Sequence, residues 1–243
     1  MEYQKVKGII VGERSYGENS KIVDILTKKY GLIGVMVKGA KKLKSPLRIV
    51  SQIFTYADFI ISYKENKLST LISADIIDNL NVIKNDIEKI SYLNYISDLT
   101  KQIIKDVSSS LVFDNYLATI LKINEGYDPM VITNILELKY TDYLGISPKF
   151  DGCVVCGKSN VVTLSSDKGG FLCKDHSFGE RIVSPKTIKI IKLLKYVDIS
   201  KISKLDISDI VRNEINNFIE DYYDRYTGIY LKSREFLKKI VNV

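Results

Sequence analysis

The 243-residue sequence predicts an α+β protein with two domains, a five-stranded β-barrel followed by an α-helical domain that carries a cysteine-rich insertion. Short β-type runs separated by turn residues fill the chain up to about residue 75. Beyond residue 80 the apolar residues recur at three- and four-residue steps, as on one face of an amphipathic helix. All three cysteines and the only histidine lie between residues 153 and 176. We therefore expect a barrel domain at 1–80 and a helical domain at 81–243, interrupted at about 150–180.

The barrel domain contains five short runs of β-branched and other apolar residues, each bounded by turn residues. The longest connection, residues 39–53, lies between the third and fourth runs and contains Pro46. Five short strands with the longest gap at this place suit a small closed barrel of the OB type. The predicted strands are 7–11, 21–26, 32–37, 55–62 and 68–72.

The helical domain is predicted from apolar periodicity together with start and stop signals. Pro129 lies near the start of one periodic segment, and Pro185 opens another. Gly145 and Pro148 end the helix that precedes the cysteines. The predicted helices are 87–103, 111–123, 131–144, a segment from 185 to about 194, roughly 207–226, and 231–240.

The spacing of the cysteines and the histidine is typical of a zinc finger. Two residues separate the members of each pair, and sixteen residues separate the two pairs. Each two-residue gap lets two side chains converge on one ion from a tight turn, and four protein ligands leave no position open for water. A redox pair would explain only the first two cysteines, and Asp175 is the alternative to the histidine as fourth ligand. We predict one structural Zn²⁺ ion bound by Cys153, Cys156, Cys173 and His176.

The positive charge is concentrated in one part of the barrel domain. The net charge of +7 can follow from lysine abundance alone, but no acidic residue lies between Asp24 and Asp58. In an OB-type barrel the third strand and the connection after it border the oligonucleotide groove, where lysines neutralise phosphates and release counterions. The cations of this window are Lys28, Lys29, Lys38, Lys41, Lys42, Lys44 and Arg48. We predict nucleic-acid binding by Lys38, Lys41, Lys42, Lys44 and Arg48, with a merely solvated face as the alternative.

Aromatic residues in and around this window are candidates for base stacking. An unpaired base can stack on a tyrosine ring whatever its sequence. For any one of these tyrosines, a half-buried position in a strand is the simpler interpretation. The candidates are Tyr16, Tyr30, Tyr56 and Tyr63.

Enzymatic activity is not expected. The only histidine is assigned to the metal, so a histidine general base is not available. A zinc deaminase needs Glu two residues after its ligand histidine, where Phe178 stands. The carboxylates are scattered along the chain rather than clustered as around two catalytic metals. Because the chain has no signal-peptide-like start and no apolar run of roughly 18 residues, we expect a cytoplasmic location and no membrane partner.

Several short segments lie in a characteristic order along nearly the whole chain. They are Gly17–Val23, Gly39–Ser45, Leu136–Leu138, Leu144–Pro148, Cys153–Gly157, Gly169–Cys173 and Leu231–Leu237. Each segment by itself is a modest signal, whereas their order is specific. In this order they resemble the RecO recombination-mediator proteins of bacteria.

The resemblance implies an OB-fold domain followed by a helical domain with a zinc finger. Proteins of the RecO family bind single- and double-stranded DNA and anneal complementary strands. With RecR they help to load the RecA recombinase onto DNA coated by single-strand-binding protein, whose acidic, phenylalanine-ended tail they also bind. The resemblance therefore implies a mediator of DNA repair and homologous recombination, associated with the nucleoid during repair. Its partners would be DNA, RecR, the tail of single-strand-binding protein and, indirectly, RecA.

The sequence departs from the family pattern at two places. The family often has Cys where His176 stands, and His is an equally competent zinc ligand. After Ser45 the family continues with Arg and glycines, whereas this chain has Pro46, Leu47 and Arg48, which makes Arg48 a less certain DNA contact than Lys41. The alternative functions are an RNA-binding factor in translation or ribosome assembly and a metal-dependent nuclease.

Overall fold

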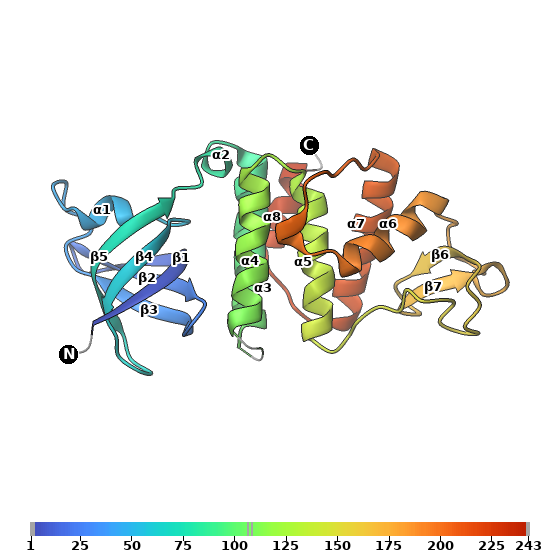
Figure 1. Cartoon of the computed structure of the whole chain (residues 1–243), viewed down its shortest axis with the longest axis horizontal. Coiled ribbons are helices and arrows are strands. Elements are labelled where there is room, and N and C mark those ends of the chain that lie inside the picture. The colour runs from blue at the N-terminus through green and yellow to red at the C-terminus, as the bar shows by residue number, and fades with distance from the viewer. Residues whose placement is uncertain (1–2, 106, 108, 242–243) are drawn as a thin grey trace. The chain divides into compact units, whose positions relative to one another are not determined.

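The computed structural model describes residues 3–105, residue 107 and residues 109–241. By its internal contacts the chain forms two compact units, Met1–Leu117 and Ala118–Val243. These contact units are a different division from the predicted domains, so the boundary at residue 80 stays a prediction. Followed along the chain, Figure 1 shows strands first, then helices, then a small two-stranded hairpin, and then helices again. Among the described residues, no helix has the length and apolar character needed to cross a bilayer.

The first unit contains a closed five-stranded barrel, as predicted (Figure 1). Its strands follow one another around the barrel in the order β1-β2-β3-β5-β4. All neighbouring strands are antiparallel except β3 and β5, which run parallel. The strands are β1 (Tyr3–Tyr16), β2 (Ser20–Thr27), β3 (Gly31–Val37), β4 (Tyr56–Ser62) and β5 (Ser69–Asp78).

The barrel interior is filled by side chains that alternate along the strands, because successive residues of a strand point to opposite faces. β-Branched residues dominate this core, where their stiff side chains pack well on a pleated surface. The connection between β3 and β4 contains a four-residue helix, α1 (Leu47–Val50), whose Leu47 and Val50 pack against the core. The core residues include Ile10, Val23, Ile25, Val35, Val37, Phe59 and Ile61.

The helices agree with the predicted segments to within a few residues, and α3, α5 and α6 each begin after a residue whose side chain caps the first turn. The Asp86 carboxylate accepts hydrogen bonds from the backbone N–H of Glu88 and Lys89, and that of Asp128 accepts one from Val131. The two four-residue helices, α1 and α2, were not predicted. The helices are α2 (Asn81–Lys84), α3 (Ile87–Ile103), α4 (Ser109–Asn124), α5 (Pro129–Tyr143), α6 (Pro185–Tyr196), α7 (Asp209–Tyr226) and α8 (Lys232–Val241).

The predicted insertion lies between α5 and α6. It consists of a two-stranded antiparallel hairpin, β6 (Val161–Ser165) and β7 (Gly170–Cys173), followed by a 3-10 turn at Lys174–His176. A second 3-10 turn, Ile199–Lys201, follows α6. Beside the cysteines lies a small apolar cluster whose buried members are Cys153, Leu172 and Cys173, while Phe171 of β7 packs on Phe150, which in turn contacts Phe218 of α7. The aromatic contacts anchor the hairpin, whereas the small cluster leaves the turns that carry the cysteines with little hydrophobic stabilisation.

The ammonium group of Lys195 is buried in the second unit and connects α6 to α5. It donates to the carboxylate of Asp142, to the hydroxyl of Ser147 at 2.7 Å and to the carbonyl oxygen of Leu138 at 3.3 Å. The Lys195 side chain is only 5% exposed, whereas that of Asp142 is 44% exposed, so water weakens their attraction. The value of the lysine lies mainly in satisfying several acceptors at once.

We expect Lys195→Met to lower the free energy of unfolding by about 2 kcal/mol, because the buried Leu138 carbonyl and the more exposed Asp142 and Ser147 lose their shared donor while the apolar stem is retained. Urea denaturation measures this value. The matched control is Lys192→Met on the same helix, where an exposed lysine pairs with exposed Asp151 at 3.3 Å. A control change larger than about 0.5 kcal/mol, or an unchanged Lys195→Met protein, would contradict this account.

Candidate metal centre and nucleic-acid interface

The first pair of cysteines lies on a tight turn that the backbone closes on itself. The N–H of Gly157 donates to the carbonyl of Cys153 at 2.8 Å, and the N–H of Cys153 donates to the carbonyl of Lys158 at 2.9 Å. Gly157 has φ +75°, a conformation in which other residues are strained. A Cβ atom at Gly152 would lie 2.7 Å from the Gly157 oxygen. Glycine at these two positions therefore permits the turn that aims both thiols at one point.

The second pair is placed by the end of the hairpin. Cys173 is the last residue of β7, and the 3-10 turn after it brings His176 back beside the Cys173 thiol. The Asp175 carboxylate does not join them, because it accepts a hydrogen bond from Lys158 Nζ at 2.7 Å. In the part of the chain that the structure describes, the side chains close enough to share one metal ion here are the three cysteines and His176, without Asp175.

The four ligand atoms have the spacing of a tetrahedral metal site. They all lie within 4.8 Å of one another. The sulfurs of Cys156 and Cys173 are 3.8 Å apart, and His176 Nδ1 lies 3.4 Å from Cys173 Sγ and 3.6 Å from Cys153 Sγ. With Zn–S bonds of about 2.3 Å and Zn–N bonds of about 2.0 Å, a tetrahedron gives about 3.8 Å between sulfurs and about 3.5 Å between sulfur and nitrogen. The residues present therefore fit a metal ion of this kind.

The electrostatics of the site favour a metal-binding thiolate. Burial acts to raise the pKa of the Cys153 thiol, but backbone N–H groups of Cys173, Cys156 and Val155 and the His176 ring lower it to about 6. At Cys156 the backbone of Lys158 acts to lower the pKa, and the thiols of Cys153 and Cys173 raise it. Thiolate is the form that binds metal, and a bound cation would remove the repulsion between neighbouring sulfurs.

The predicted nucleic-acid-binding residues all lie on the connection from β3 to β4, and all five are exposed. This connection is held against the β1–β2 turn, because the N–H of Lys41 donates to the carbonyl of Asn19 at 3.0 Å. The ammonium of Lys41 also donates to the carbonyl of Gly17 at 3.2 Å. The hydroxyl of Ser20 accepts from the N–H of Gly39 at 3.2 Å. These contacts give the cationic loop a defined position on the barrel.

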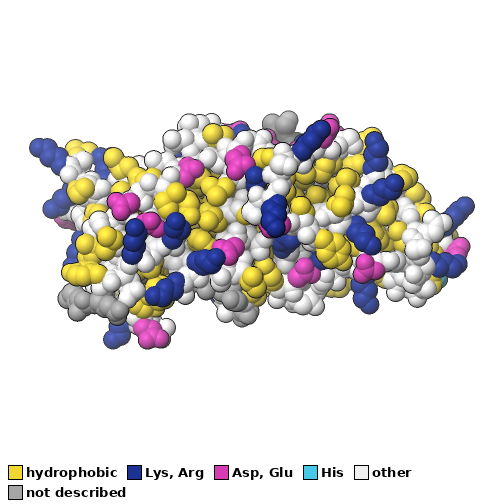
Figure 2. Space-filling model, in the orientation of Figure 1, with side chains coloured by type: hydrophobic (Ala, Val, Ile, Leu, Met, Phe, Trp, Pro, Cys, Tyr) yellow, Lys and Arg dark blue, Asp and Glu magenta, His cyan; other side chains and the backbone are white. Residues whose placement is uncertain are grey.

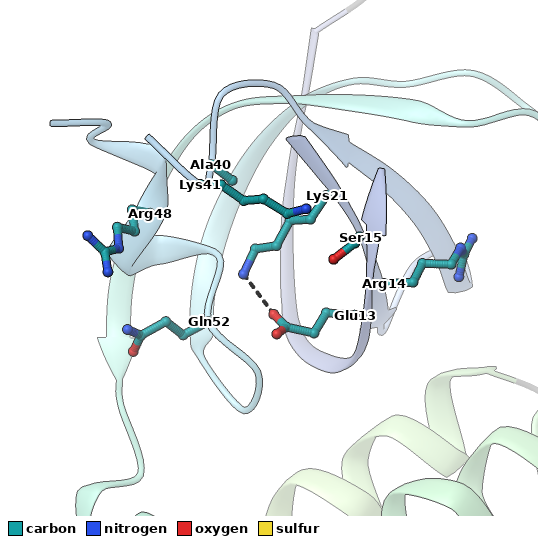
Figure 3. A pocket seen from close by; sticks show the side chains of 8 residues that line it. All are labelled: Glu13, Arg14, Ser15, Lys21, Ala40, Lys41, Arg48 and Gln52. Carbon is teal, nitrogen blue, oxygen red and sulfur yellow. Dashed lines mark hydrogen bonds and ion pairs between the residues drawn. The ribbon is translucent and has the colours of Figure 1, made fainter. Parts of the chain in front are cut away.

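A pocket of about 420 Å³ lies between this loop and the β1–β2 hairpin (Figure 3). Figure 3 shows Lys41 and Lys21 reaching across the same space, with Arg48 and Gln52 on the other side of it. Of the five predicted residues, Lys41 and Arg48 line the pocket, whereas Lys38, Lys42 and Lys44 do not. The lining residues are Glu13, Arg14, Ser15, Lys21, Ala40, Lys41, Arg48 and Gln52.

Two cations of this pocket, Arg14 and Lys21, were missed by the sequence reasoning. Lys21 pairs with Glu13 at 2.7 Å, and Arg14 pairs with Asp24 at 3.0 Å. Both pairs join neighbouring strands β1 and β2. Figure 3 shows the Lys21–Glu13 pair inside the group, with Arg14 pointing away from the other side chains. The pocket therefore combines several cations with one carboxylate, an arrangement that can hold a phosphate and accept a hydrogen bond from a base.

Charge is not concentrated into one large patch over the rest of the visible surface. Figure 2 shows Lys and Arg side chains interspersed with apolar and acidic ones on that face. Lys28 and Lys29 belong to the acid-free window but contact other side chains of the protein. Lys28 pairs with Asp114 at 2.7 Å, and the ammonium of Lys29 lies 4.7 Å from the centre of the Tyr30 ring. The loop and its pocket, rather than the net charge, identify the candidate interface.

Three of the four candidate tyrosines are committed to packing. Tyr30 and Tyr63 stack on each other, with ring centres 4.2 Å apart, and Tyr56 is buried. Tyr16, at the end of β1, is 54% exposed. It is the member of this group that can offer an open ring face to a base.

Comparison with known proteins gives one consistent result over both parts of the chain. Residues 1–80 match the family model "Recombination protein O N terminal", and residues 84–235 match "Recombination protein O C terminal". The chain is 34% identical to the DNA repair protein RecO of Halalkalibacterium halodurans, covering 98% of this chain and 95% of that protein. It is 35% identical to the DNA repair protein RecO of Bacillus cytotoxicus, covering 98% of both chains.

Proposed function

The chain belongs to the RecO family, a family of non-enzymatic DNA repair and recombination proteins, and on this basis we propose that it binds single- and double-stranded DNA and anneals complementary strands. The observation that carries the proposal is the cationic loop and pocket on the barrel. Lys41 and Arg48 line the pocket, and Lys38, Lys42 and Lys44 are exposed on the loop beside it.

Lysines in this position would neutralise DNA phosphates and release their counterions. Binding would therefore be strongly salt-dependent and largely independent of the DNA sequence. The pocket is large enough for one unstacked nucleotide, and the exposed Tyr16, which follows the lining residue Ser15 in the sequence, would add an aromatic face. Strands bound in an extended, unstacked form have their pairing edges open to a complementary strand. This is the physical basis of the annealing activity that we assign to the chain.

We infer that the metal at the insertion is one Zn²⁺ ion with a structural role. Cys153, Cys156, Cys173 and His176 would fill its tetrahedral coordination, so no position is left for a substrate or a reactive water. Bound there, zinc would supply folding energy to the turns that carry its ligands, where the apolar cluster is small.

In the cell we expect the chain to work in the cytoplasm, on the nucleoid during repair. With RecR it would help to load RecA onto DNA coated by single-strand-binding protein, and it would bind the acidic tail of that protein. Family membership supports these partners. Co-purification of RecR and single-strand-binding protein with the tagged chain tests them.

Annealing of two complementary oligonucleotides, one with a fluorophore and one with a quencher, tests the proposed function. We expect the wild-type chain to accelerate annealing of DNA at low salt, and the acceleration to fall as salt rises. The length of the DNA should stay unchanged when Mg²⁺ or Mn²⁺ is added, because four protein ligands would leave the bound metal no open position for hydrolysis. If RNA strands of the same sequence were bound and annealed in strong preference to DNA, an RNA-binding function would replace the present one.

A further inference from the structure

The second unit contains a separate pocket of about 460 Å³ beside the metal centre. Four segments form it: the Gly145–Lys149 connection after α5, the Cys153–Cys156 turn, the β6–β7 turn and the end of α7. We propose that this pocket takes one unpaired base of a second DNA strand, with the adjacent phosphates on Lys149 and Lys168. The inference rests on the proposed function, because annealing requires one protein to hold two strands.

The floor of the pocket is aromatic. The rings of Tyr222 and Tyr226 lie with centres 4.5 Å apart, and both line the pocket. Tyr222 is buried, whereas Tyr226 is 41% exposed, so the pair ends in an open ring. The Tyr222 hydroxyl donates to the carbonyl of Ile146 at 2.6 Å, and that of Tyr226 donates to the carbonyl of Asp167 at 2.9 Å. Both rings are therefore held in place before a base arrives.

The walls of the pocket are also held in place. The N–H of Lys149 donates to the carbonyl of Gly169 at 2.9 Å, and the N–H of Phe171 donates to the carbonyl of Lys149 at 3.1 Å. A Cβ atom at Gly170 would lie 2.2 Å from the Lys149 oxygen, so only glycine permits this approach. The N–H of Val154 donates to Phe171 at 2.9 Å. A pocket formed in advance binds a base without the entropic cost of ordering loops.

The charge around the pocket suits a polyanion. Two lysines line it, Lys149 and Lys168, and no carboxylate is among its described lining residues. Asp167, next to Lys168 in the sequence, is already paired with Lys168 at 3.0 Å and with Arg225 at 3.5 Å. Both pairs are exposed, so a phosphate can replace the carboxylate at little cost. Stacking on Tyr226 with phosphates on lysines is the usual way to bind an unpaired strand.

The position of the pocket gives the metal centre a role in binding. Val154 and Val155 stand between the ligands Cys153 and Cys156 and line the pocket. The same turn that holds the metal thus forms one wall of the base site. Each unit then carries its own strand-binding site, the barrel for one strand and this pocket for the other.

The test uses the full chain with zinc and a single-stranded oligonucleotide that contains 5-bromodeoxyuridine. Irradiation followed by mass spectrometry should find a cross-linked peptide that contains Tyr226, and this cross-link should persist in the Lys41→Glu/Lys42→Glu protein. The variant Tyr226→Leu/Lys149→Gln/Lys168→Gln should lose the cross-link and anneal roughly tenfold more slowly. Tyr226→Phe keeps the aromatic ring, so this variant should retain both the cross-link and the wild-type annealing rate. Zinc content and thermal melting verify that each variant is folded.

The matched control is Tyr196→Leu/Lys186→Gln/Lys201→Gln, which makes the same changes outside the pocket lining and should anneal like wild type. Annealing without the Tyr226 cross-link would overturn this inference alone. A cross-link without annealing would support the strand site and overturn the proposed annealing activity. If the pocket variant lost affinity for an acidic, phenylalanine-ended peptide and bound and annealed DNA normally, the pocket would be a peptide site and the proposal would be wrong.

Discussion

Cys153→Ser is expected to reduce the zinc content from about one equivalent to near zero and to unfold the segment between α5 and α6. Cys153 is buried and packs with Leu172 and Cys173 in an apolar cluster too small to hold the two ligand turns together by itself. In isolated zinc fingers the metal contributes roughly 10–16 kcal/mol of apparent binding free energy, which is folding free energy. The helices have their own buried residues and should keep most of their helicity.

Elemental analysis of the purified protein measures the metal, and limited proteolysis locates the unfolded segment. New cleavage sites should fall within about residues 150–180. Asp175→Asn is the matched control, because this carboxylate contacts Lys158 rather than the cluster. The control should keep about one equivalent of zinc, and His176→Ala should lose it. Retention of zinc by Cys153→Ser, or loss of zinc by Asp175→Asn alone, would show that the ligand set is wrong.

Lys41→Glu/Lys42→Glu is expected to weaken binding of single-stranded DNA by more than about tenfold at low salt. Each lysine that neutralises a phosphate contributes about 0.7 to the slope of log affinity against log salt. Losing two such contacts should reduce the slope by about 1.4. Reversing the charge adds repulsion next to the pocket that Lys41 lines. Fluorescence anisotropy across a series of salt concentrations measures both quantities.

Lys64→Glu/Lys67→Glu makes the same change of net charge on exposed lysines between β4 and β5, outside the pocket lining. This control should change the affinity by less than about threefold, through the long-range field of the protein alone. Equal losses in the two variants would mean that the barrel attracts DNA only by its total charge. The loop at Lys41 and Lys42 would then lose its assigned role.

The barrel strands show how well an apolar sequence pattern predicts where a strand ends. The pattern ends at Val11, but β1 continues to Tyr16 because its backbone pairs with β2 as far as Ser20. Residues 13–16 are exposed on both faces and have no alternation to detect. β5 was predicted to end at 72 and extends to Asp78 for the same reason. Pairing with a neighbour, rather than local composition, sets these ends.

Both four-residue helices escaped the sequence analysis for a simple reason. A segment of one turn is too short to show a 3.6-residue period. In addition, α2 begins after Leu80, which has φ +52°, a left-handed conformation rare for a leucine. The buried Leu80 side chain compensates for this conformation with packing that the sequence does not reveal.

The two candidate sites differ in how much of each was predictable. The metal ligands form pairs close in sequence, and a tight turn brings each pair together, so their spacing predicted the cluster. The barrel pocket combines β1, β2 and the loop after β3. Arg14 and Lys21 join it through strand register, which no local pattern contains. Lys38, Lys42 and Lys44 share the loop with Lys41 but line no part of the pocket.

We propose that the chain anneals DNA through the cationic loop and pocket of its barrel. The most direct test is the rate of annealing of complementary DNA strands at matched salt by wild type, Lys41→Glu/Lys42→Glu and Lys64→Glu/Lys67→Glu. We predict that Lys41→Glu/Lys42→Glu loses about nine-tenths or more of the acceleration. The annealing rate with Lys64→Glu/Lys67→Glu should stay within about threefold of the wild-type rate. Equal acceleration by all three proteins would contradict the proposal.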